Sequence, residues 1–367
     1  MQEPLQISIV RSILPLNFMK KKVVVGMSGG VDSSVSALLL KEQGYEVIGL
    51  FMKNWEEKNS EGVCLSSNDY EDVVKVCEQI GIPYFSVNFV KEYWDNVFTH
   101  FIEELKLGHT PNPDVLCNRE IKFKVFFQKA LELGADFLAT GHYAKTDHQR
   151  LLKSVDQDKD QTYFLYTLQA KTLEKVLFPL SDLTKKEVRA IAAKNGLATS
   201  EKKDSTGICF IGERNFKPFL SQFIPYQAGD LQTLSGKVVG QHTGVAYHTI
   251  GQRKGLGIGG AGDAWFVVGK NVEKNIIYVE QGEDHPALYS SKLTASDIHW
   301  ISGKAPELPL RCHAKIRYRQ PDQECVIEKI EDGHLVVSFV TPQRAITPRQ
   351  SIVFYQDDCC LGGALII

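Results

Sequence analysis

The feature that most constrains this chain is a glycine-rich turn that follows a β-branched run near the N-terminus. Residues 23–25 are all valine and predict a buried strand, residues 28–30 (Ser-Gly-Gly) break it, and residues 33–40 continue as an apolar-faced helix. A strand, a glycine turn and a helix N-terminus together form an anion site, because glycine lets the backbone approach a phosphate and helix N–H groups point at it. The chain is therefore predicted to bind a nucleotide.

This turn differs from the common kinase-type phosphate loop. That loop has a lysine directly after its last glycine, whereas Val31 and Asp32 follow Gly30 here. The form Ser-Gly-Gly-x-Asp-Ser at residues 28–33 resembles the loop of the PP-loop ATP pyrophosphatases. Those enzymes cleave ATP to AMP and pyrophosphate while adenylating a substrate oxygen. The loop predicts this activation step and leaves the substrate open.

Length and charge limit the remaining possibilities. A chain of 367 residues is long enough for two or three domains, and its net charge of −2 excludes a generally basic nucleic-acid coat. No apolar run reaches the roughly 18 residues of a membrane span, and the apolar stretch at residues 7–16 is interrupted by Arg11. A cytoplasmic protein without membrane contact is expected. Met19 is a candidate start, and residues 1–20 are expected to form an extra N-terminal segment outside the domains.

Strand and helix patterns alternate from residue 22 to about residue 215, which predicts an α/β domain with a doubly wound parallel sheet. Beyond about Tyr226 the pattern consists of short, glycine-punctuated strands, which predicts two small all-β domains, the last of them a β-barrel. The expected boundaries are 21–217 for the ATP-binding catalytic domain, 218–280 for the central β domain and 281–367 for the barrel.

Two of the eight cysteines stand out. None of the eight forms a Cys-x-x-Cys pair, which disfavours a zinc ribbon, so no metal site is assigned and buried thiol is the default interpretation. Cys117, however, lies three residues after Asp114, near a helix start and close to Arg119, where a thiolate is favoured. Cys209 lies in a glycine-flanked segment downstream of two lysines.

The adenylating loop and the two cysteines combine into one reaction. The C2 oxygen of a pyrimidine is a poor leaving group, and adenylation converts it into AMP, which a sulfur nucleophile can displace. A persulfide on one cysteine supplies the sulfur, and the second cysteine releases it by forming a disulfide with the first. Two well-separated cysteines beside an AMP-forming loop meet these requirements.

Five further segments make the resemblance specific. The chain resembles the bacterial tRNA-specific 2-thiouridylases at residues 112–118 (NPDVLCN), 141–144 (GHYA), 159–165 (KDQTYFL), 205–212 (STGICFIG) and 249–257 (TIGQRKGLG). The matches run in family order from residue 26 to about residue 320. That family makes 2-thiouridine at the wobble uridine (U34) of tRNAs for lysine, glutamate and glutamine.

The resemblance implies roles for individual residues. ATP, with Mg²⁺, would be held by Gly26, Met27, Ser28, Gly29, Gly30, Val31, Asp32 and Ser33, with Met52 and Gly141 near the adenosine. Ser28 and Asp32 would serve phosphate or magnesium coordination, since a carboxylate near ATP is best used on a metal.

For the target base and the sulfur, the resemblance implies that Asn112, Pro113 and Asp114 contact the uridine and that Asp114 moves a proton. Cys209 would carry a persulfide delivered by a sulfur-relay protein or a cysteine desulfurase. Cys117 would end in a transient disulfide with Cys209. The enzyme is expected to be a monomer.

Contacts with tRNA are predicted in two segments. Lys159, Asp160 and Gln161 match a tRNA-contact segment of the family. Arg317 and Tyr318 lie in a basic stretch without acidic residues (311–319), where arginine can hold a phosphate and tyrosine can stack on a base. From the residues alone, a solvated strand face explains this stretch equally well.

Three alternatives remain open at this point. An amide- or imine-forming synthetase with the same loop would leave both cysteines idle, and an RNA-binding module would use only the β-rich half. In a third alternative, Asp114, Cys117 and Cys209 hold an iron–sulfur cluster with one open iron. The missing Cys-x-x-Cys pair favours the persulfide over the cluster.

Overall fold

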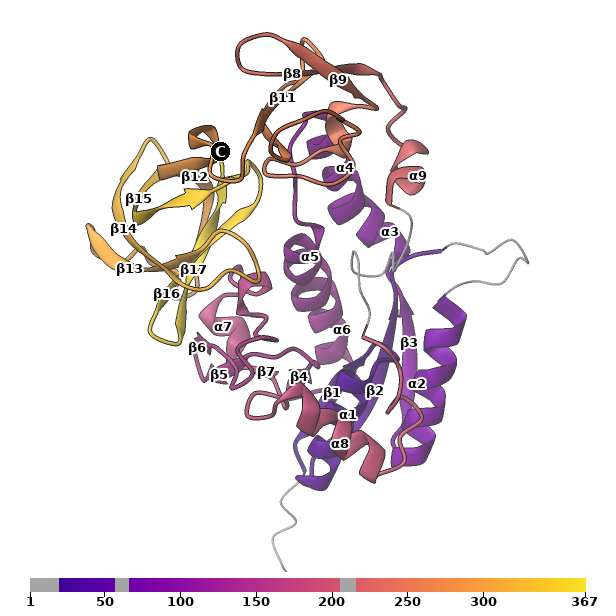
Figure 1. Cartoon of the computed structure of the whole chain (residues 1–367). Coiled ribbons are helices and arrows are strands. Elements are labelled where there is room, and N and C mark those ends of the chain that lie inside the picture. The colour runs from indigo at the N-terminus through magenta and orange to yellow at the C-terminus, as the bar shows by residue number, and fades with distance from the viewer. Residues whose placement is uncertain (1–19, 57–65, 205–215) are drawn as a thin grey trace, which may run out of the picture.

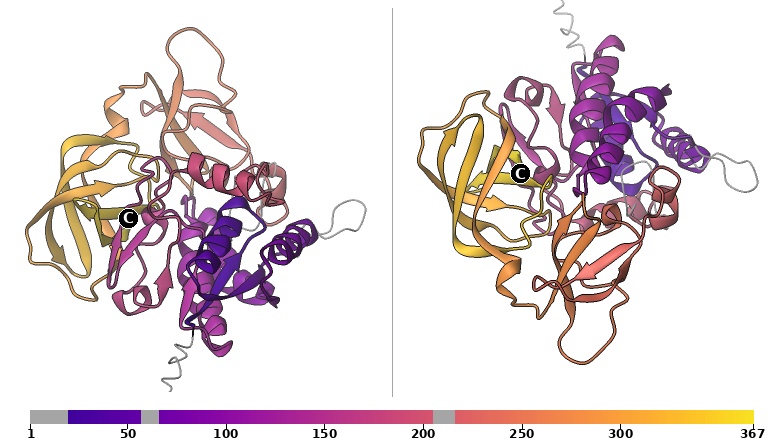
Figure 2. Two further views of the ribbon diagram at one scale, coloured as in Figure 1. Left: turned by 90° about the horizontal axis from the view of Figure 1, so that it is seen from below. Right: turned by 90° about the horizontal axis from the view of Figure 1, so that it is seen from above.

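The computed structural model describes residues 20–56, 66–204 and 216–367. Cys209 and Cys64 therefore lie outside the described residues. Figure 1 shows an α/β part, a β-barrel beside it and a smaller β part above both, and the two views of Figure 2 agree on this arrangement. Within the described ranges, no helix is long and apolar enough to cross a bilayer.

The α/β part is built on five parallel strands in the order β3-β2-β1-β4-β7. Successive valines of β1 enter two different cores, because neighbouring side chains on a strand point to opposite faces. Val24 packs with one helical layer, and Val23 and Val25 pack with the other. The predicted doubly wound parallel sheet is confirmed. The strands are β1 (Lys22–Met27), β2 (Glu46–Lys53), β3 (Tyr84–Asn88), β4 (Phe137–Ala139) and β7 (Val176–Leu177).

Helices cover both faces of this sheet (Figure 1). One layer, which shares a core with Val23 and Val25, consists of α1 (Val31–Glu42), α2 (Ser66–Ile80) and α8 (Lys185–Lys194). The other layer contains two long helices, each with a π-helical middle. They are α3 (Val90–Tyr93), η1 (Trp94–Phe98) and α4 (Thr99–Lys106), followed by α5 (Pro113–Leu116), η2 (Cys117–Phe126) and α6 (Phe127–Glu132).

The C-terminal part is a barrel of six antiparallel strands closed by pairing between its first and last strands. Its strands are β12 (Tyr289–Trp300), β13 (Leu310–Lys315), β14 (Gln323–Glu331), β15 (His334–Arg344), β16 (Ser351–Gln356) and β17 (Cys359–Ile366). The α/β part adds the hairpin of β5 (Lys145–Asp147) and β6 (Arg150–Leu152) to this sheet, with β6 paired to β17. The predicted barrel is confirmed, and a hairpin from the preceding part of the chain extends it.

The central part is a four-stranded sheet in the order β10-β11-β8-β9, formed by β8 (Gly229–Gln232), β9 (Val238–His242), β10 (Trp265–Asn271) and β11 (Ile276–Gln281). It has its own small core, which includes Leu231 and Val267.

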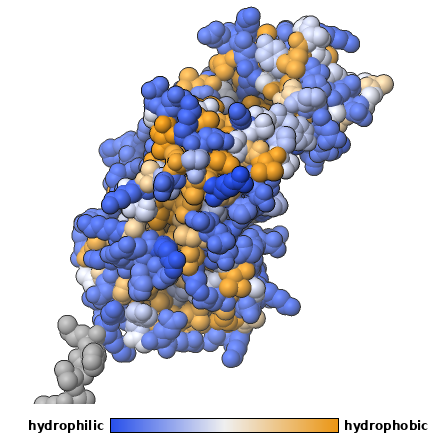
Figure 3. Space-filling view, turned by 90° about the vertical axis from the view of Figure 1, so that its left-hand side faces the viewer, coloured by the Kyte–Doolittle hydropathy of each residue, from blue (hydrophilic) through white to orange (hydrophobic). Residues whose placement is uncertain are grey.

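The space-filling view in Figure 3 shows one face of the whole molecule, on which a band of apolar side chains is bordered by hydrophilic ones. The remaining short elements are η3 (Thr162–Phe164), α7 (Ala170–Leu173), α9 (Phe216–Ser221), η4 (Val245–Tyr247) and η5 (Pro286–Leu288).

Candidate active site

The glycine turn between β1 and α1 is held in shape by its own serines. The Ser28 N–H donates to the Ser33 hydroxyl at 3.2 Å, and the Ser33 and Ser34 hydroxyls donate to the Gly30 carbonyl at 3.1 and 2.8 Å. Gly29 has a φ of +74°, and a Cβ there would lie 2.5 Å from the carbonyl oxygen of Asp69. Only glycine meets both conditions. The turn is therefore held in this shape by groups of the chain itself.

The exit of β4 reaches the start of α1 at Gly141. A Cβ on Gly141 would lie 2.8 Å from the Ser33 amide nitrogen and 3.1 Å from the Asp32 Cβ, so the two backbones touch. β1 lies between β2 and β4, and the order of the strands reverses at this point. Ligands of open α/β sheets bind at such a switch point, beyond the carboxyl ends of the strands. Met52, near the end of β2, lies at the same edge.

Asp32 is bound by two residues from distant parts of the chain. The Tyr143 hydroxyl donates to its carboxylate at 3.0 Å, and the Lys185 ammonium lies 2.8 Å from both carboxylate oxygens. Burial, followed by the charge of Asp32, raises the pKa of Tyr143, so its hydroxyl stays protonated. Sequence reasoning placed Asp32 at this site and missed both partners.

A second carboxylate, Asp204, completes this charge network. It pairs with Lys185 at 2.8 Å, Arg189 at 2.7 Å and Lys159 at 3.0 Å. Burial alone would raise the pKa of Asp204, but hydrogen bonds from Lys185 and Lys159 outweigh it and lower the pKa to about 2. The network thus joins three cations and two carboxylates beside the glycine turn.

The segment with Asn112 and Cys117 begins a helix on the opposite face of the sheet. The Asn112 side chain caps this helix by accepting a hydrogen bond from the Asp114 N–H at 3.1 Å, and Pro113 occupies the first helical position, where its missing N–H costs nothing. Asp114 lies in the first turn, and Cys117 follows three residues later, fully buried. The structure thus explains two of these residues by helix capping, and their predicted contact with a uridine stays a prediction.

A buried histidine links this helix to the loop after β4. The two ring nitrogens of His142 lie 2.8 Å from the Thr140 hydroxyl and 3.4 Å from the Lys122 ammonium. Burial, assisted by the Lys122 charge, lowers the pKa of His142 well below its usual value, so the ring is neutral. Because a lysine can only donate, the ring nitrogen facing Lys122 accepts and the other carries the proton toward Thr140.

In the predicted tRNA segment at residues 159–161, Asp160 is buried, whereas Lys159 and Gln161 are half-buried. Asp160 is only 4% exposed, accepts a hydrogen bond from the Ser154 N–H at 2.8 Å, and has its pKa raised by burial. Gln161 accepts from the Tyr143 N–H at 3.0 Å, so it also organises the loop. Lys159 keeps a half-exposed side chain. The tRNA contacts predicted for the three residues stay predictions.

The second predicted tRNA segment lies against the first. The Tyr318 ring packs on Phe164 at a centroid distance of 4.5 Å, and its hydroxyl donates to the Lys159 carbonyl at 3.4 Å. The exposed Arg317 donates to the Ala345 carbonyl at 2.9 Å. The structure therefore joins residues more than 150 positions apart on one surface.

The side chains around the turn could bind Mg²⁺ only together with phosphate oxygens of a nucleotide. Among the described residues, no group of three His, Cys, Asp or Glu side chains is arranged to hold a metal ion. Magnesium in nucleotide enzymes is commonly held by one or two carboxylates plus phosphate oxygens, and Asp32 provides such a carboxylate. Because Cys209 lies outside the described residues, its disulfide with Cys117 and the cluster alternative both stay untested.

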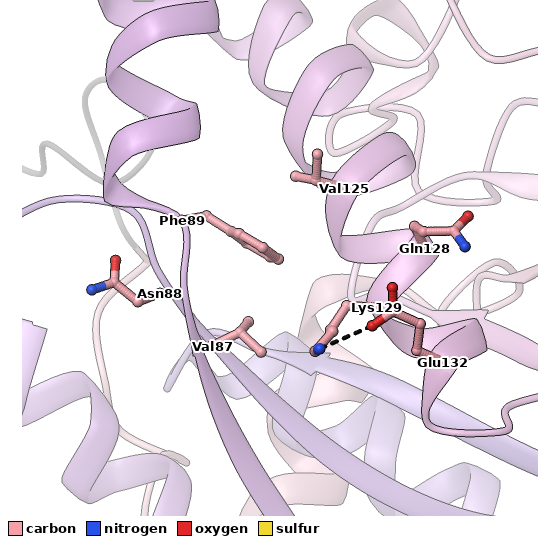
Figure 4. A pocket seen from close by; sticks show the side chains of 7 residues that line it. All are labelled: Val87, Asn88, Phe89, Val125, Gln128, Lys129 and Glu132. Carbon is pink, nitrogen blue, oxygen red and sulfur yellow. Dashed lines mark hydrogen bonds and ion pairs between the residues drawn. The ribbon is translucent and has the colours of Figure 1, made fainter.

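A cavity of about 420 Å³ lies between the end of β3 and the η2–α6 helix. In Figure 4, Lys129 and Glu132 form an ion pair at its edge, at 2.9 Å. It contains none of the predicted site residues, being lined by Val87, Asn88, Phe89, Val125, Gln128, Lys129 and Glu132.

Comparisons with known proteins match nearly all of the chain, from residue 21 to residue 366, to the domains of one family. Residues 21–213 match the model described as a tRNA methyl transferase HUP domain, residues 217–281 match its PRC-barrel domain, and residues 290–366 match an aminomethyltransferase beta-barrel domain. These descriptions mention methyl transfer, whereas the relatives below carry names for thiolation.

Three relatives are each called tRNA-specific 2-thiouridylase MnmA. The protein of Protochlamydia amoebophila is 63% identical over 95% of this chain and 93% of its own length. That of Halalkalibacterium halodurans is 60% identical over 94% of each chain, and that of Staphylococcus aureus is 59% identical over 94% of this chain and 95% of its own. At this identity and coverage, the chain belongs to the tRNA-specific 2-thiouridylase family.

Proposed function

We propose that this chain is a tRNA 2-thiouridine synthase, a sulfurtransferase that adenylates the C2 oxygen of the wobble uridine and then replaces it with sulfur. The observation that carries the proposal is the preformed Ser-Gly-Gly turn at the switch point of the sheet, in a chain 58–63% identical to 2-thiouridylases. The products are 2-thiouridine, AMP and pyrophosphate.

ATP is proposed to bind along the turn, with its phosphates on residues 26–33 and its adenosine near Met52 and Gly141. The N-terminus of α1 supplies N–H groups and a positive dipole to the phosphates. Asp32, released from Lys185, is a suitable ligand for Mg²⁺. A bound Mg²⁺ would neutralise charge on the phosphates and the leaving pyrophosphate.

The uridine is proposed to lie against Asn112, Pro113 and Asp114. When the C2 oxygen attacks the α-phosphorus of ATP, its double bond to carbon moves to the C2–N3 bond, and N3 must lose its proton. Asp114, in the first turn of the helix that carries Cys117, is proposed to accept that proton. The attack releases pyrophosphate and leaves AMP attached to the base.

Sulfur transfer is proposed to use both cysteines. The outer sulfur of a Cys209 persulfide attacks C2 and expels AMP. Cys117 then attacks the inner sulfur of Cys209, which forms a Cys117–Cys209 disulfide and leaves the outer sulfur on the base as 2-thiouridine. A thiol reductant restores the cysteines, and a sulfur-relay protein or a cysteine desulfurase supplies the next persulfide.

The tRNA substrates are proposed to be those for lysine, glutamate and glutamine, bound by one copy of the chain. Lys159, Arg317 and Tyr318 supply the exposed or half-exposed contact groups on one surface, and Asp160 and Gln161 hold the loop that positions Lys159. We also propose that the functional domains divide at residues 217 and 280, with the catalytic part beginning near residue 21.

The test is a reaction with purified full-length protein, unmodified tRNA, ATP and a protein persulfide donor. Nucleoside mass spectrometry should detect 2-thiouridine, with pyrophosphate released in equal amount. Cys209→Ala should abolish the thionucleoside, whereas Cys359→Ala, a change at a half-buried cysteine of the barrel, should not.

Two results would decide against the proposal. Unchanged 2-thiouridine formation by Cys209→Ala would exclude the persulfide route, and a nitrogen-containing product would favour the amide- or imine-forming alternative. Iron analysis after anaerobic purification covers the remaining alternative. A stoichiometric cluster required for turnover would replace the persulfide mechanism.

A further inference from the structure

The glycine turn has no cation of its own, yet one is placed against it by a distant helix. Residues 28–33 contain no lysine or arginine. The Lys185 ammonium lies 2.8 Å from both oxygens of Asp32, the second residue of α1, and 2.8 Å from Asp204. We propose that Lys185 binds the β- and γ-phosphates of ATP and the pyrophosphate released from it. This inference rests on the proposed function, because it assigns a residue to the leaving group of that reaction.

The position of Lys185 is fixed by rigid structure. It is the first residue of α8, whose start is closed by a capping box between Thr184 and Glu187, and its own N–H donates to Asp156 at 2.8 Å. α8 packs against α1 in a shared core, through Val188 and Ala192 among others. The lysine is therefore held at the turn by two helices that are packed together.

The charge balance allows Lys185 to leave its present partners. Its side chain is 13% exposed and lies between Asp32 and Asp204, with the Tyr143 ring 5.9 Å from the ammonium. Asp204 keeps Arg189 and Lys159 when Lys185 moves. Asp32 becomes available to a metal ion in the same step. A phosphate can therefore take Lys185 without leaving Asp204 unpaired.

The face on which Lys185 lies indicates which phosphates it binds. Cys117 belongs to the core on one face of the sheet, together with Val24. α1 and α8 pack on the opposite face, with Val23 and Val25 (Figure 1). In phosphoryl transfer, the attacking and leaving oxygens lie on opposite sides of the phosphorus. A base bound near Cys117 therefore expels pyrophosphate toward α8 and Lys185.

Calorimetry with pyrophosphate and with AMP separates this role from a purely structural one. The probes are inorganic pyrophosphate with Mg²⁺ and AMP, each titrated into full-length wild type, Lys185→Gln, Lys185→Arg and the control Lys186→Gln. Lys186 is the next residue of α8 and is exposed. Lys185→Gln should weaken pyrophosphate binding by about tenfold or more, as expected for loss of a charge-assisted contact. Binding of AMP should change by less than about twofold, and Lys186→Gln should match wild type.

A charged but differently shaped side chain provides the second variant. Lys185→Arg should bind pyrophosphate more tightly than Lys185→Gln, because it keeps the charge.

An acetylation experiment on wild-type protein tests the same contact without any variant. Pyrophosphate but not AMP should slow acetylation of Lys185, as measured by mass spectrometry. Equal losses for AMP and pyrophosphate, or no loss, would overturn the inference, as would acetylation that pyrophosphate leaves unchanged. A wild-type protein that binds neither probe would instead contradict the proposed nucleotide chemistry itself.

Discussion

Gly141→Ala should weaken ATP binding through steric contact alone. The added Cβ would lie 2.8 Å from the Ser33 amide nitrogen, whereas ordinary contacts begin at 3.4 Å, so the exit of β4 and the start of α1 must separate by about 0.6 Å. The two segments are backbone, which cannot turn aside as a flexible side chain can. Inserting a methyl group into such a filled space typically costs about 1–3 kcal/mol.

The same displacement gives the expected loss of affinity. A hydrogen bond of about 2.9 Å from the Ser33 amide to a phosphate would lengthen to roughly 3.5 Å, beyond the useful range. A hydrogen bond to a charged group is worth about 1.5–3 kcal/mol, which corresponds to roughly a 10- to 100-fold rise in Kd. The melting temperature should fall by about 2–4 °C per kcal/mol of strain.

Calorimetric titration with ATP and a thermal melt measure both effects. Gly259→Ala is the matched control, because a Cβ there meets nothing within 4 Å and the backbone is not in the left-handed region. It should leave both the Kd and the melting temperature unchanged. An ATP Kd for Gly141→Ala within about twofold of wild type would refute the reasoning, as would an equal loss in Gly259→Ala.

Two further predictions concern charge. Arg317→Gln should weaken tRNA binding and reduce the slope of log K against log salt by about 1, as expected for one phosphate contact; an unchanged slope in a gel shift would place Arg317 off the RNA. For Asp204, the folded-state pKa of about 2 lies below the ordinary value, so its ion pairs stabilise the fold above the ordinary carboxyl pKa and are lost as pH falls toward 2. Asp204→Asn should therefore lose less stability than wild type between about pH 4 and pH 2, and parallel melting curves would contradict this.

Local patterns were enough to predict the parallel sheet and its first loop. The valine run of β1 and the glycines that follow it are constrained by neighbours in sequence, so strand, turn and helix could be predicted together. The structure adds a physical reason for the glycine at position 141. Gly141 needs its hydrogen because the backbone of α1 occupies the space of a Cβ.

The charge network beside the turn could not be predicted. Lys185 lies 153 positions after Asp32 in the sequence, and a pair of that separation leaves no periodic or spacing pattern. The burial of Asp160 could not be predicted either, because a charged residue in a polar stretch is usually exposed. Its burial follows from hydrogen bonds to Ser154 and Thr162 that depend on the folded loop. The β5–β6 hairpin was missed because strands of three residues are too short to show alternation.

That hairpin connects the barrel, which carries the proposed tRNA surface, to the α/β part, which carries the glycine turn. β6 pairs with β17, so the barrel that carries Arg317 and Tyr318 shares a sheet with the α/β part. Tyr318 then packs on Phe164 and donates to Lys159, which in turn pairs with Asp204. Asp204 and Asp32 meet at Lys185. A continuous set of contacts therefore runs from the proposed tRNA surface to the glycine turn.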